Sequence, residues 1–281
     1  MRLFLAITMV GVATLTGHAQ SDSTGRKTSL TLASIYSTNA SYYGQTAEER
    51  LPYVLLNATL RTPYYFYLTA GGYKLLTIDD GASAAQLGAG FEFELGKNVE
   101  LGLGYIRSFY AKNSPLLQAA NTDNVSASLA VEHAFKTELT GDYMFGKEAD
   151  YFVTLGNSKK VKIGQFNPED MIVIEPGIDV VAGTQRYYQY YVSERQRLGR
   201  LVDLLPVSPP GLGRSGAETD TVAVQSTDFK MISYTFTLPV YYFRASYAVA
   251  VTYQLSVLDP NVEAISRKPR SFLSIGFYYQ F

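Results

Sequence analysis

The chain has 281 residues and a formal net charge of −1, because 24 Lys and Arg residues stand against 25 Asp and Glu residues. This balance argues against a nucleic-acid partner held by bulk charge. The absence of cysteine excludes disulfides, thiolate metal sites, thiol nucleophiles and a lipid anchor on cysteine. Hydrophobic residues make up 47% of the chain and charged residues 17%, a composition typical of a folded protein.

Residues 1–19 have the three parts of a secretory signal peptide. Arg2 supplies the positive start, Leu3–Leu15 is an apolar run, and Gly17 and Ala19 are the small residues expected before a cleavage site. The run is shorter than the about 20 apolar residues that a transmembrane helix needs. No later window is suited to a membrane helix, so a mature chain embedded in a membrane must be a closed β-barrel.

From residue 28 onward the sequence alternates with a period of two, which predicts strands rather than helices. In Gln86–Lys97, for example, Leu87 and Phe91 share one face and Glu92 lies on the other. About twelve strands are predicted. In chain order they are Thr28–Thr38, Tyr53–Thr62, Tyr64–Thr77, Gln86–Lys97, Val99–Phe109, Val125–Phe135, Thr137–Phe145, Tyr151–Ile163, Ile172–Gln185, Thr227–Leu238, Tyr241–Leu255 and Ser271–Phe281.

The connections between these strands are predicted to alternate in length. The turns on one rim of a transmembrane barrel are short and those on the other rim are longer, so the alternation favours such a barrel. The expected connections are Asn39–Leu51, Thr62-Pro63, Ile78–Ala84, Gly96–Asn98, Ala111–Asp123, Lys136, Gly146–Asp150, Gly164–Asp170, Arg186–Ser226, Pro239 and Asp259–Lys268.

Two architectures fit the alternation. A soluble sandwich or barrel turns its apolar face inward, whereas a membrane barrel turns it toward lipid. Three features favour the membrane barrel. The face opposite the apolar stripe is rich in Gly, Ser and Thr, the chain ends on a strand with Phe281, and aromatic residues lie near strand ends as in an interfacial girdle. Examples of these aromatic residues are Tyr105, Tyr143, Tyr241 and Phe243.

Tyr279 and Phe281, at the end of an alternating last strand, resemble the C-terminal assembly signal of Gram-negative outer-membrane β-barrel proteins. In that family a terminal Phe preceded by alternating apolar residues is read by the barrel-assembly machinery. The strand and loop layout of the whole mature chain is similar to the family's. The resemblance implies a transmembrane antiparallel up-and-down β-barrel in the outer membrane, in contact with lipid and lipopolysaccharide.

Under this interpretation the polar face lines a lumen. Acidic residues outnumber basic ones there, and an acidic wall in a water-filled pore favours cations. Alternatively, the acidic residues pair with basic ones across a filled or tightly constricted lumen, because about twelve strands enclose a narrow interior. The residues expected to face inward are Arg61, Glu92, Glu94, Glu100, Glu132, Glu138, Asp142, Lys160, Lys162, Glu175, Asp179 and Arg244.

Arg186–Ser226 is the largest irregular segment of the sequence. Apolar residues follow at helical spacing after its first residues, and Arg195, Arg197 and Arg200 make this stretch basic. Two interpretations stay open, because long loops are often functional. The loop either folds inward as a constriction that meets the acidic wall, or caps the barrel outside with its arginines on lipopolysaccharide phosphates.

An enzyme is not expected. His133, the one histidine beyond the predicted signal peptide, lies on the apolar stripe with Val131 and Phe135, away from any polar cleft. A Ser-His-acid site is therefore not expected. No cofactor or metal site is predicted, since Asp79-Asp80-Gly81 lacks the other ligands of a calcium loop and is typical of a turn.

The sequence thus predicts a signal peptide at residues 1–19 and one outer-membrane barrel domain over residues 20–281. Two functions remain open. The first is a narrow passive channel for small polar solutes or cations. The second is a non-conducting structural or accessory barrel that binds a partner protein through its loops or its lipid-facing surface.

Overall fold

The structure, a computed structural model, describes residues 27–46, 50–77, 84–110, 121–146, 149–184, 229–262 and 268–281. The predicted signal peptide and the segment Arg186–Ser226 lie outside these residues. Within them, no helix has the length and apolar character needed to cross a membrane. The strands are β1 (Ser29–Ser37), β2 (Tyr53–Arg61), β3 (Phe66–Leu75), β4 (Ala84–Glu94), β5 (Val99–Tyr110), β6 (Asp123–Glu132), β7 (Lys136–Phe145), β8 (Ala149–Ser158), β9 (Val161–Gly164), β10 (Asp170–Ile174), β11 (Gly177–Thr184), β12 (Phe229–Arg244), β13 (Tyr247–Leu258) and β14 (Arg270–Gln280).

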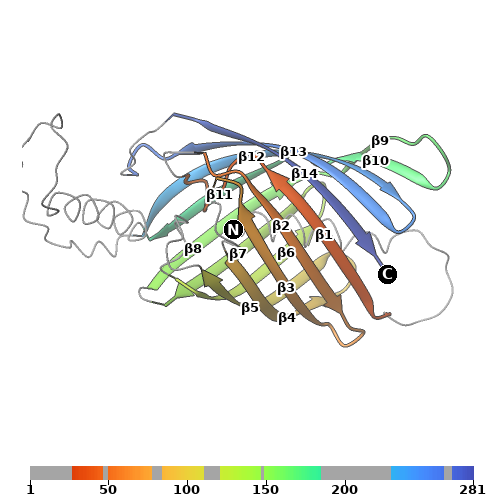
Figure 1. Cartoon of the computed structure of the whole chain (residues 1–281), viewed down its shortest axis with the longest axis horizontal. Coiled ribbons are helices and arrows are strands. Elements are labelled where there is room, and N and C mark those ends of the chain that lie inside the picture. Colours follow the sequence, from red (N-terminus) through yellow and green to blue (C-terminus); the bar gives the residue numbers. More distant parts are fainter. Residues whose placement is uncertain are drawn as a thin grey trace, which may run out of the picture.

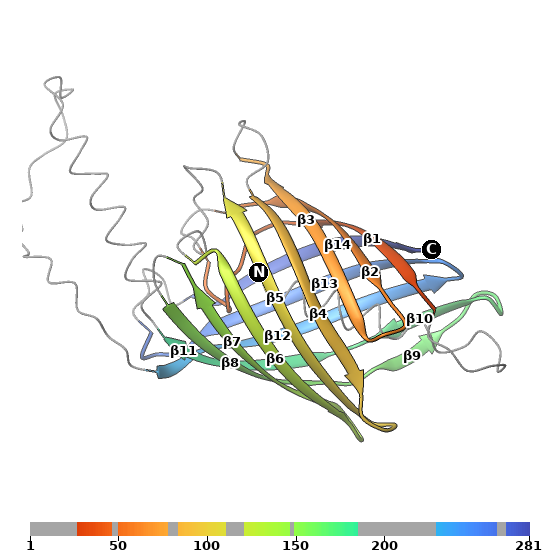
Figure 2. The ribbon, with the colours of Figure 1, turned by 90° about the horizontal axis from the view of Figure 1, so that it is seen from below.

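The strands form a closed antiparallel ring (Figures 1 and 2). Strands β1 to β8 pair in sequence order, β8 pairs with β11, β11 with β12, and β14 returns to β1. Strands β8 and β9 are two parts of one long segment, and so are β10 and β11, which are separated at Glu175-Pro176. The ring therefore has 12 strands, and the predicted up-and-down barrel is confirmed.

The two rims of the barrel differ. Strand-to-strand connections at one rim span residues 62–65, 95–98, 133–135 and 245–246, and we call this the short-turn rim. Both the start of β1 and the end of β14 lie there, since Thr31 pairs with Gln280. At the opposite, long-connection rim the strands are joined by residues 38–52, 76–83, 111–122, 146–148, 185–228 and 259–269. This segregation agrees with the alternation seen in the sequence.

A hairpin formed by β9 and β10 extends past the short-turn rim (Figure 1). Its turn is held by Asp170, whose carboxylate accepts hydrogen bonds from the backbone N–H groups of Phe166 (2.6 Å) and Asn167 (2.9 Å). These bonds, chiefly the one from Asn167, hold the pKa of Asp170 below its ordinary value. The Asp170 carboxylate thus stabilises the turn at the tip of the hairpin.

One turn lies elsewhere than predicted. The break expected at Pro239 is wrong, because β12 continues through Pro239 to Arg244 and turns at Ala245-Ser246. Proline lacks the N–H that a central strand needs. Pro239 lies opposite Glu175, in the gap between β10 and β11, so the absent N–H breaks no ladder within either strand. The Glu175 N–H still donates to the Pro239 carbonyl (3.1 Å). The strand therefore tolerates the proline.

This shift reverses the facing of the residues after Pro239, because side chains alternate along a strand. Tyr241 was expected to face lipid but is buried inside the barrel, and Phe243 packs against the same interior cluster. Arg244 was expected in the lumen but is exposed, on the outward side of the strand shared with Val240. These three assignments are corrected accordingly.

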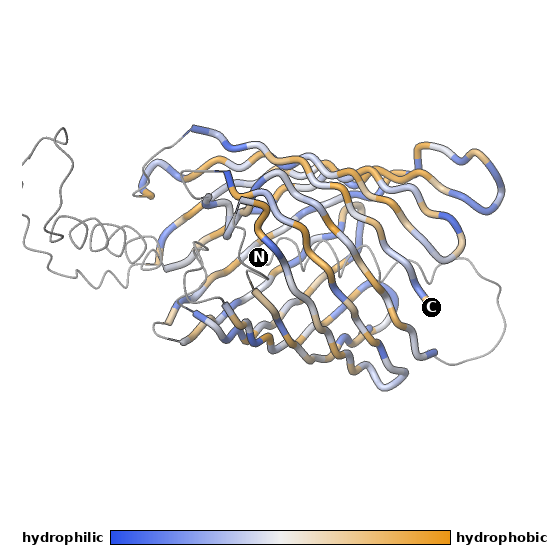
Figure 3. Tube along the Cα trace, viewed as in Figure 1, coloured by the Kyte–Doolittle hydropathy of each residue, from blue (hydrophilic) through white to orange (hydrophobic). Residues whose placement is uncertain are grey.

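Elsewhere the apolar stripe faces outward. Large apolar side chains at alternate positions are exposed around the ring, among them Leu56, Leu87, Leu103, Leu139 and Ile275. Figure 3 shows the resulting alternation of hydrophobic and hydrophilic residues along the strands. Between these positions lie buried polar residues such as Gln86, Ser108, Thr235 and Gln254. A protein surrounded by water buries the first set and exposes the second, so the surface fits a hydrocarbon environment.

Candidate functional site

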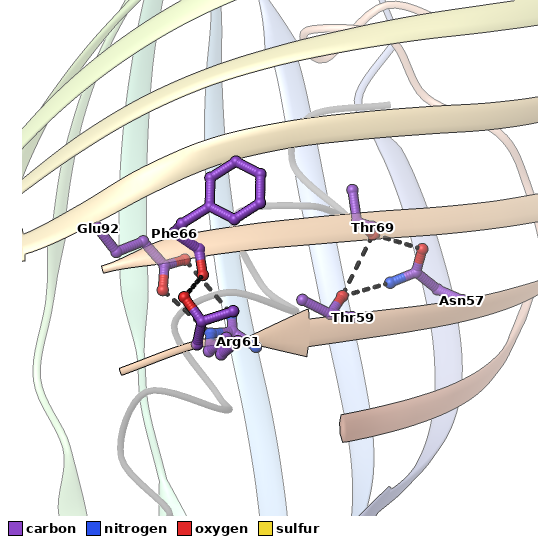
Figure 4. A network of polar contacts seen from close by, with 7 residues as sticks. Asn57, Thr59, Arg61, Phe66, Thr69 and Glu92 are labelled. Atoms are coloured by element: carbon purple, nitrogen blue, oxygen red, sulfur yellow. Dashed lines mark hydrogen bonds and ion pairs between the residues drawn. The ribbon is translucent and has the colours of Figure 1, made fainter. Parts of the chain in front are cut away.

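The interior of the barrel begins with a polar network on β2, β3 and β4 (Figure 4). The Arg61 guanidinium donates to the Glu92 carboxylate from Nε (3.0 Å) and Nη2 (3.4 Å). Farther from the short-turn rim in the same wall, the Asn57 amide donates to the Thr59 hydroxyl (3.0 Å), and the Thr69 hydroxyl donates to the Asn57 carbonyl (3.1 Å). The wall is therefore polar, and its side chains are hydrogen-bonded to one another, as polar groups inside a protein generally are.

The other residues expected to line the lumen fall into three groups. Glu138, Asp142, Glu175 and Asp179 lie at inward positions and are at least partly buried. Glu94, Glu100 and Glu132 are exposed where their strands meet the short-turn rim. Lys160 and Lys162 are exposed; Lys160 lies between β8 and β9, and Lys162 lies on β9.

A basic residue that the sequence pattern missed also belongs to this region. Lys136 was expected in a tight turn, but it starts β7 and donates from Nζ to the Glu100 carboxylate (2.7 Å). The turn instead comprises residues 133–135. The only available signal was that Lys136 lies two residues before Glu138, and therefore on the same face of a strand.

Two acidic residues flank a glycine in the lumen. Glu138 on β7 and Asp179 on β11 both pair in register with Gly156 on β8. A Cβ atom on Gly156 would lie 2.7 Å from Asp179 Oδ1, so the missing side chain makes room for this carboxylate. Gly156 thus separates Glu138 from Asp179, and Lys136, two positions before Glu138 on the same face, interacts with Glu138 electrostatically while it donates to Glu100. Glu92, by contrast, is paired directly with Arg61. The described residues contain no group of three or more His, Asp or Glu placed to hold a metal ion.

Solvent exposure of the inward residues changes along the barrel axis. Toward the short-turn rim, inward positions on β5 to β8 and β11 are half-exposed, except for Ala130, which is buried; the half-exposed ones are Gly102, Gly104, Ser126, Ser128, Glu138, Thr140, Thr154, Gly156 and Asp179. Toward the long-connection rim the inward positions of the same strands are buried; these are Ile106, Ser108, Asn124, Asp142, Met144, Asp150, Phe152 and Val181. The lumen is thus accessible from the short-turn rim and closed near the other.

The connection between β1 and β2 contributes to this closure. Residues Asn39–Gln45, which we call the plug, fold into the barrel instead of away from it, and Tyr42 and Tyr43 are 2% and 4% exposed. At its tip, Tyr42 and Gln45 exchange two backbone hydrogen bonds (2.8 and 2.9 Å). Tyr43 and Gly44 both have positive φ (50° and 82°), the conformation of a tight two-residue turn of type I′.

The plug reaches the opposite wall of the barrel. The Tyr43 ring stacks on Phe152 of β8, with ring centroids 3.8 Å apart and planes at 9°, and the Tyr42 hydroxyl donates to the sulfur of Met144 on β7. In the ring of 12 strands, β7 and β8 lie opposite β1 and β2, from which the plug starts. The plug therefore crosses the full width of the lumen.

Two serine hydroxyls on neighbouring strands fix the tip of the plug. Ser233 of β12 donates to the Tyr43 carbonyl (2.8 Å), and Ser256 of β13 donates to the Gly44 carbonyl (3.0 Å). A Cβ atom on Gly44 would clash with both serine side chains. Glycine is thus required here for its left-handed backbone and for its lack of a side chain.

The base of the plug is closed by Asn39. Its side-chain oxygen accepts hydrogen bonds from the backbone N–H groups of Ala40 (3.0 Å) and Leu51 (2.8 Å), and so joins the two ends of the connection. The β1–β2 ladder ends just before the plug, at the pair Ser37 and Tyr53, and it is unbroken from there to the short-turn rim. The plug is therefore an addition to a barrel whose sheet is already closed.

The sequence predicted a constriction in another place. Arg195, Arg197 and Arg200 lie outside the described residues, so the inward-folding interpretation of Arg186–Ser226 stays a prediction. Residues 39–51 were expected only as a loop. The contacts that hold the plug join residues more than 100 positions apart, such as Tyr42 and Met144, and no local pattern encodes them.

Comparisons with known proteins give the architecture alone. No protein-family model and no curated protein matches the chain. Among solved structures, a KdgM porin is similar with a TM-score of 0.48 and 8% identity, over 89% of this chain and 99% of that chain. An outer-membrane channel from Pseudomonas putida F1 has a TM-score of 0.47 and 14% identity, over 94% and 98%. LpxR from Salmonella typhimurium has a TM-score of 0.42 and 7% identity, over 89% and 99%. Function must follow from the chain's own residues.

Proposed function

We propose that the chain is an outer-membrane channel for small polar solutes that prefers cations. The observation that carries this proposal is the half-exposed, acidic lumen wall below the plug, where Glu138 and Asp179 flank Gly156. Carboxylates lining a narrow aqueous path lower the electrostatic energy of a cation in it and raise that of an anion. An interior built only for packing has no need of such a wall.

The cellular setting forms part of the proposal. A signal peptide at residues 1–19 directs export, and Tyr279 and Phe281 present the terminal signal to the barrel-assembly machinery. The end of β14 is suited to this role, since Phe281 is 67% exposed and its ring lies 4.6 Å from that of Tyr279. Lipid then surrounds the apolar surface, and lipopolysaccharide meets the long-connection rim.

The selectivity is tested in planar lipid bilayers under a salt gradient. We expect the reversal potential of the purified barrel to indicate cation preference. The double variant Glu138→Gln/Asp179→Asn should reduce that preference several-fold with little change in fold, because both substitutions keep the side-chain size. Glu132→Gln, at the exposed rim, is the matched control and should have a smaller effect. An anion-selective channel would refute the proposal.

The closed long-connection end favours a second candidate. A barrel whose plug never leaves its seat conducts nothing, and would act as a structural or accessory protein that binds a partner through its loops or lipid-facing surface. The two candidates separate experimentally, because the intact barrel conducts only if its plug leaves the seat and the path below the plug is continuous.

A further inference from the structure

We propose that the plug, Asn39–Gln45, is a gate that leaves its seat to open the lumen from the long-connection rim. This inference rests on the proposed channel function and assigns its regulation. It is carried by the way the plug is attached and by what lies beneath it.

The attachment leaves the barrel intact when the plug moves. The β1–β2 ladder runs in register from Ser29 and Arg61 to Ser37 and Tyr53, so no strand pairing depends on residues beyond Ser37. Thr38 is held separately, by hydrogen bonds between its backbone N–H and the Leu273 carbonyl and between its hydroxyl and the Leu273 N–H (each 3.0 Å). Both ends of the connection therefore stay fixed while the tip is displaced.

The polar contacts at the tip can be exchanged for water, whereas its ring contacts must break when the plug moves. Among the described residues the tip contacts include two hydroxyl-to-carbonyl hydrogen bonds, from Ser233 and Ser256, the stack of Tyr43 on Phe152 and the contact of Tyr42 with Met144. The two tyrosines also belong to a buried apolar cluster with Val181 and Ile232. The turn between Tyr42 and Gln45 carries its own backbone hydrogen bonds, so the tip keeps its shape outside the seat. A plug with these properties moves as a unit about its Asn39 base.

The position of the seat gives the movement a consequence. The buried inward residues of β5 to β8 lie at the level of the plug, and the half-exposed ones lie between it and the short-turn rim. Displacing the plug would thus uncover buried inward residues such as Met144 and Phe152, next to a polar lumen that is already accessible from the short-turn rim. The plug excludes solutes without blocking the part of the lumen that would select them.

The natural chain has no cysteine, so an engineered pair can lock the plug without competing thiols. In Tyr43→Cys/Phe152→Cys the thiols replace two stacked rings across the lumen. We expect the oxidised protein to be closed and reduction to raise the open probability by about tenfold or more. The control pair Ser34→Cys/Phe277→Cys joins β1 to β14 on the outward face, in register, and should not respond to reduction. A third variant replaces residues 40–46 by two glycines and should conduct continuously.

The outcomes separate the gate from the channel. If the locked and reduced proteins conduct equally, the plug does not gate and the channel proposal stands. If the shortened variant conducts but Tyr43→Cys in the intact plug never reacts with a bulky maleimide, the plug is a static wall and the gate is refuted. If the shortened variant is silent as well, the channel proposal fails, and the gate fails with it.

Discussion

Removing both serine hydroxyls at the plug seat should shift the balance between closed and open lumen. Ser233 and Ser256 each donate one hydrogen bond to a plug carbonyl, at 2.8 and 3.0 Å. A neutral hydrogen bond of this kind contributes about 1 kcal/mol net. The variant Ser233→Ala/Ser256→Ala should therefore destabilise the seated plug by about 2 kcal/mol, which changes the closed-to-open ratio by about 30-fold.

Single-channel recording measures this ratio directly from the dwell times. The open probability should rise mainly because the closed dwells become shorter, since the hydroxyls contact the plug only when it is seated. Ser126→Ala is the matched control, since Ser126 donates a similar bond to a backbone carbonyl, that of Gly104 (3.2 Å), on a wall away from the seat. Closed dwells that are unchanged in the double variant, or equally shortened in the control, would refute the reasoning.

Three further substitutions test separate parts of the barrel. Arg61→Met should increase cation selectivity several-fold in bilayer recordings, because it leaves the charge of Glu92 uncompensated in the lumen. Pro239→Ala should change the free energy of unfolding in urea by no more than about 1 kcal/mol, since the new N–H gains a partner at Glu175 while the unfolded chain gains freedom. Asp170 has a lowered pKa, so its contribution to hairpin stability is complete above the ordinary Asp value of about 3.9 and disappears as the pH falls through its native pKa. Hydrogen exchange of the hairpin amides should show this loss, and Asp170→Asn should abolish the pH dependence.

The strand order could be predicted from the sequence because the information is local. Alternation along Gln86–Lys97 and the turn residues after it specify a strand and its end without reference to the rest of the chain. The error at Pro239 shows where this breaks down. A proline normally ends an interior strand, and it is tolerated here only because the neighbouring segment is itself interrupted at Glu175-Pro176. That compensation comes from a strand distant in sequence.

The candidate site likewise combines features that local sequence predicts with features that depend on distant segments. Inward positions such as Glu92 and Glu138 follow from strand parity alone, once the apolar stripe is assigned to lipid. The plug cannot be predicted in this way, because its seat is assembled from Met144, Phe152 and Ser233, which come together only when the ring closes. Its one local signal is Gly44, which marks a turn but not the direction in which the turn points.

The division of the lumen into two walls explains why the plug must cross it. A cluster of tyrosines and aliphatic residues fills the wall formed by β1 to β3 and β12 to β14; Tyr53, Tyr73, Tyr241 and Tyr278 belong to it. The half-exposed polar positions lie on the other wall, from β5 to β8 and β11, and near the short-turn rim also on β2 and β4. A connection that begins between β1 and β2 starts on the filled side, so it can close the passage only by extending to β7 and β8. The stack of Tyr43 on Phe152 is the contact that completes this crossing, and substitution of either ring should therefore open the lumen more than substitution of any residue at the base of the plug.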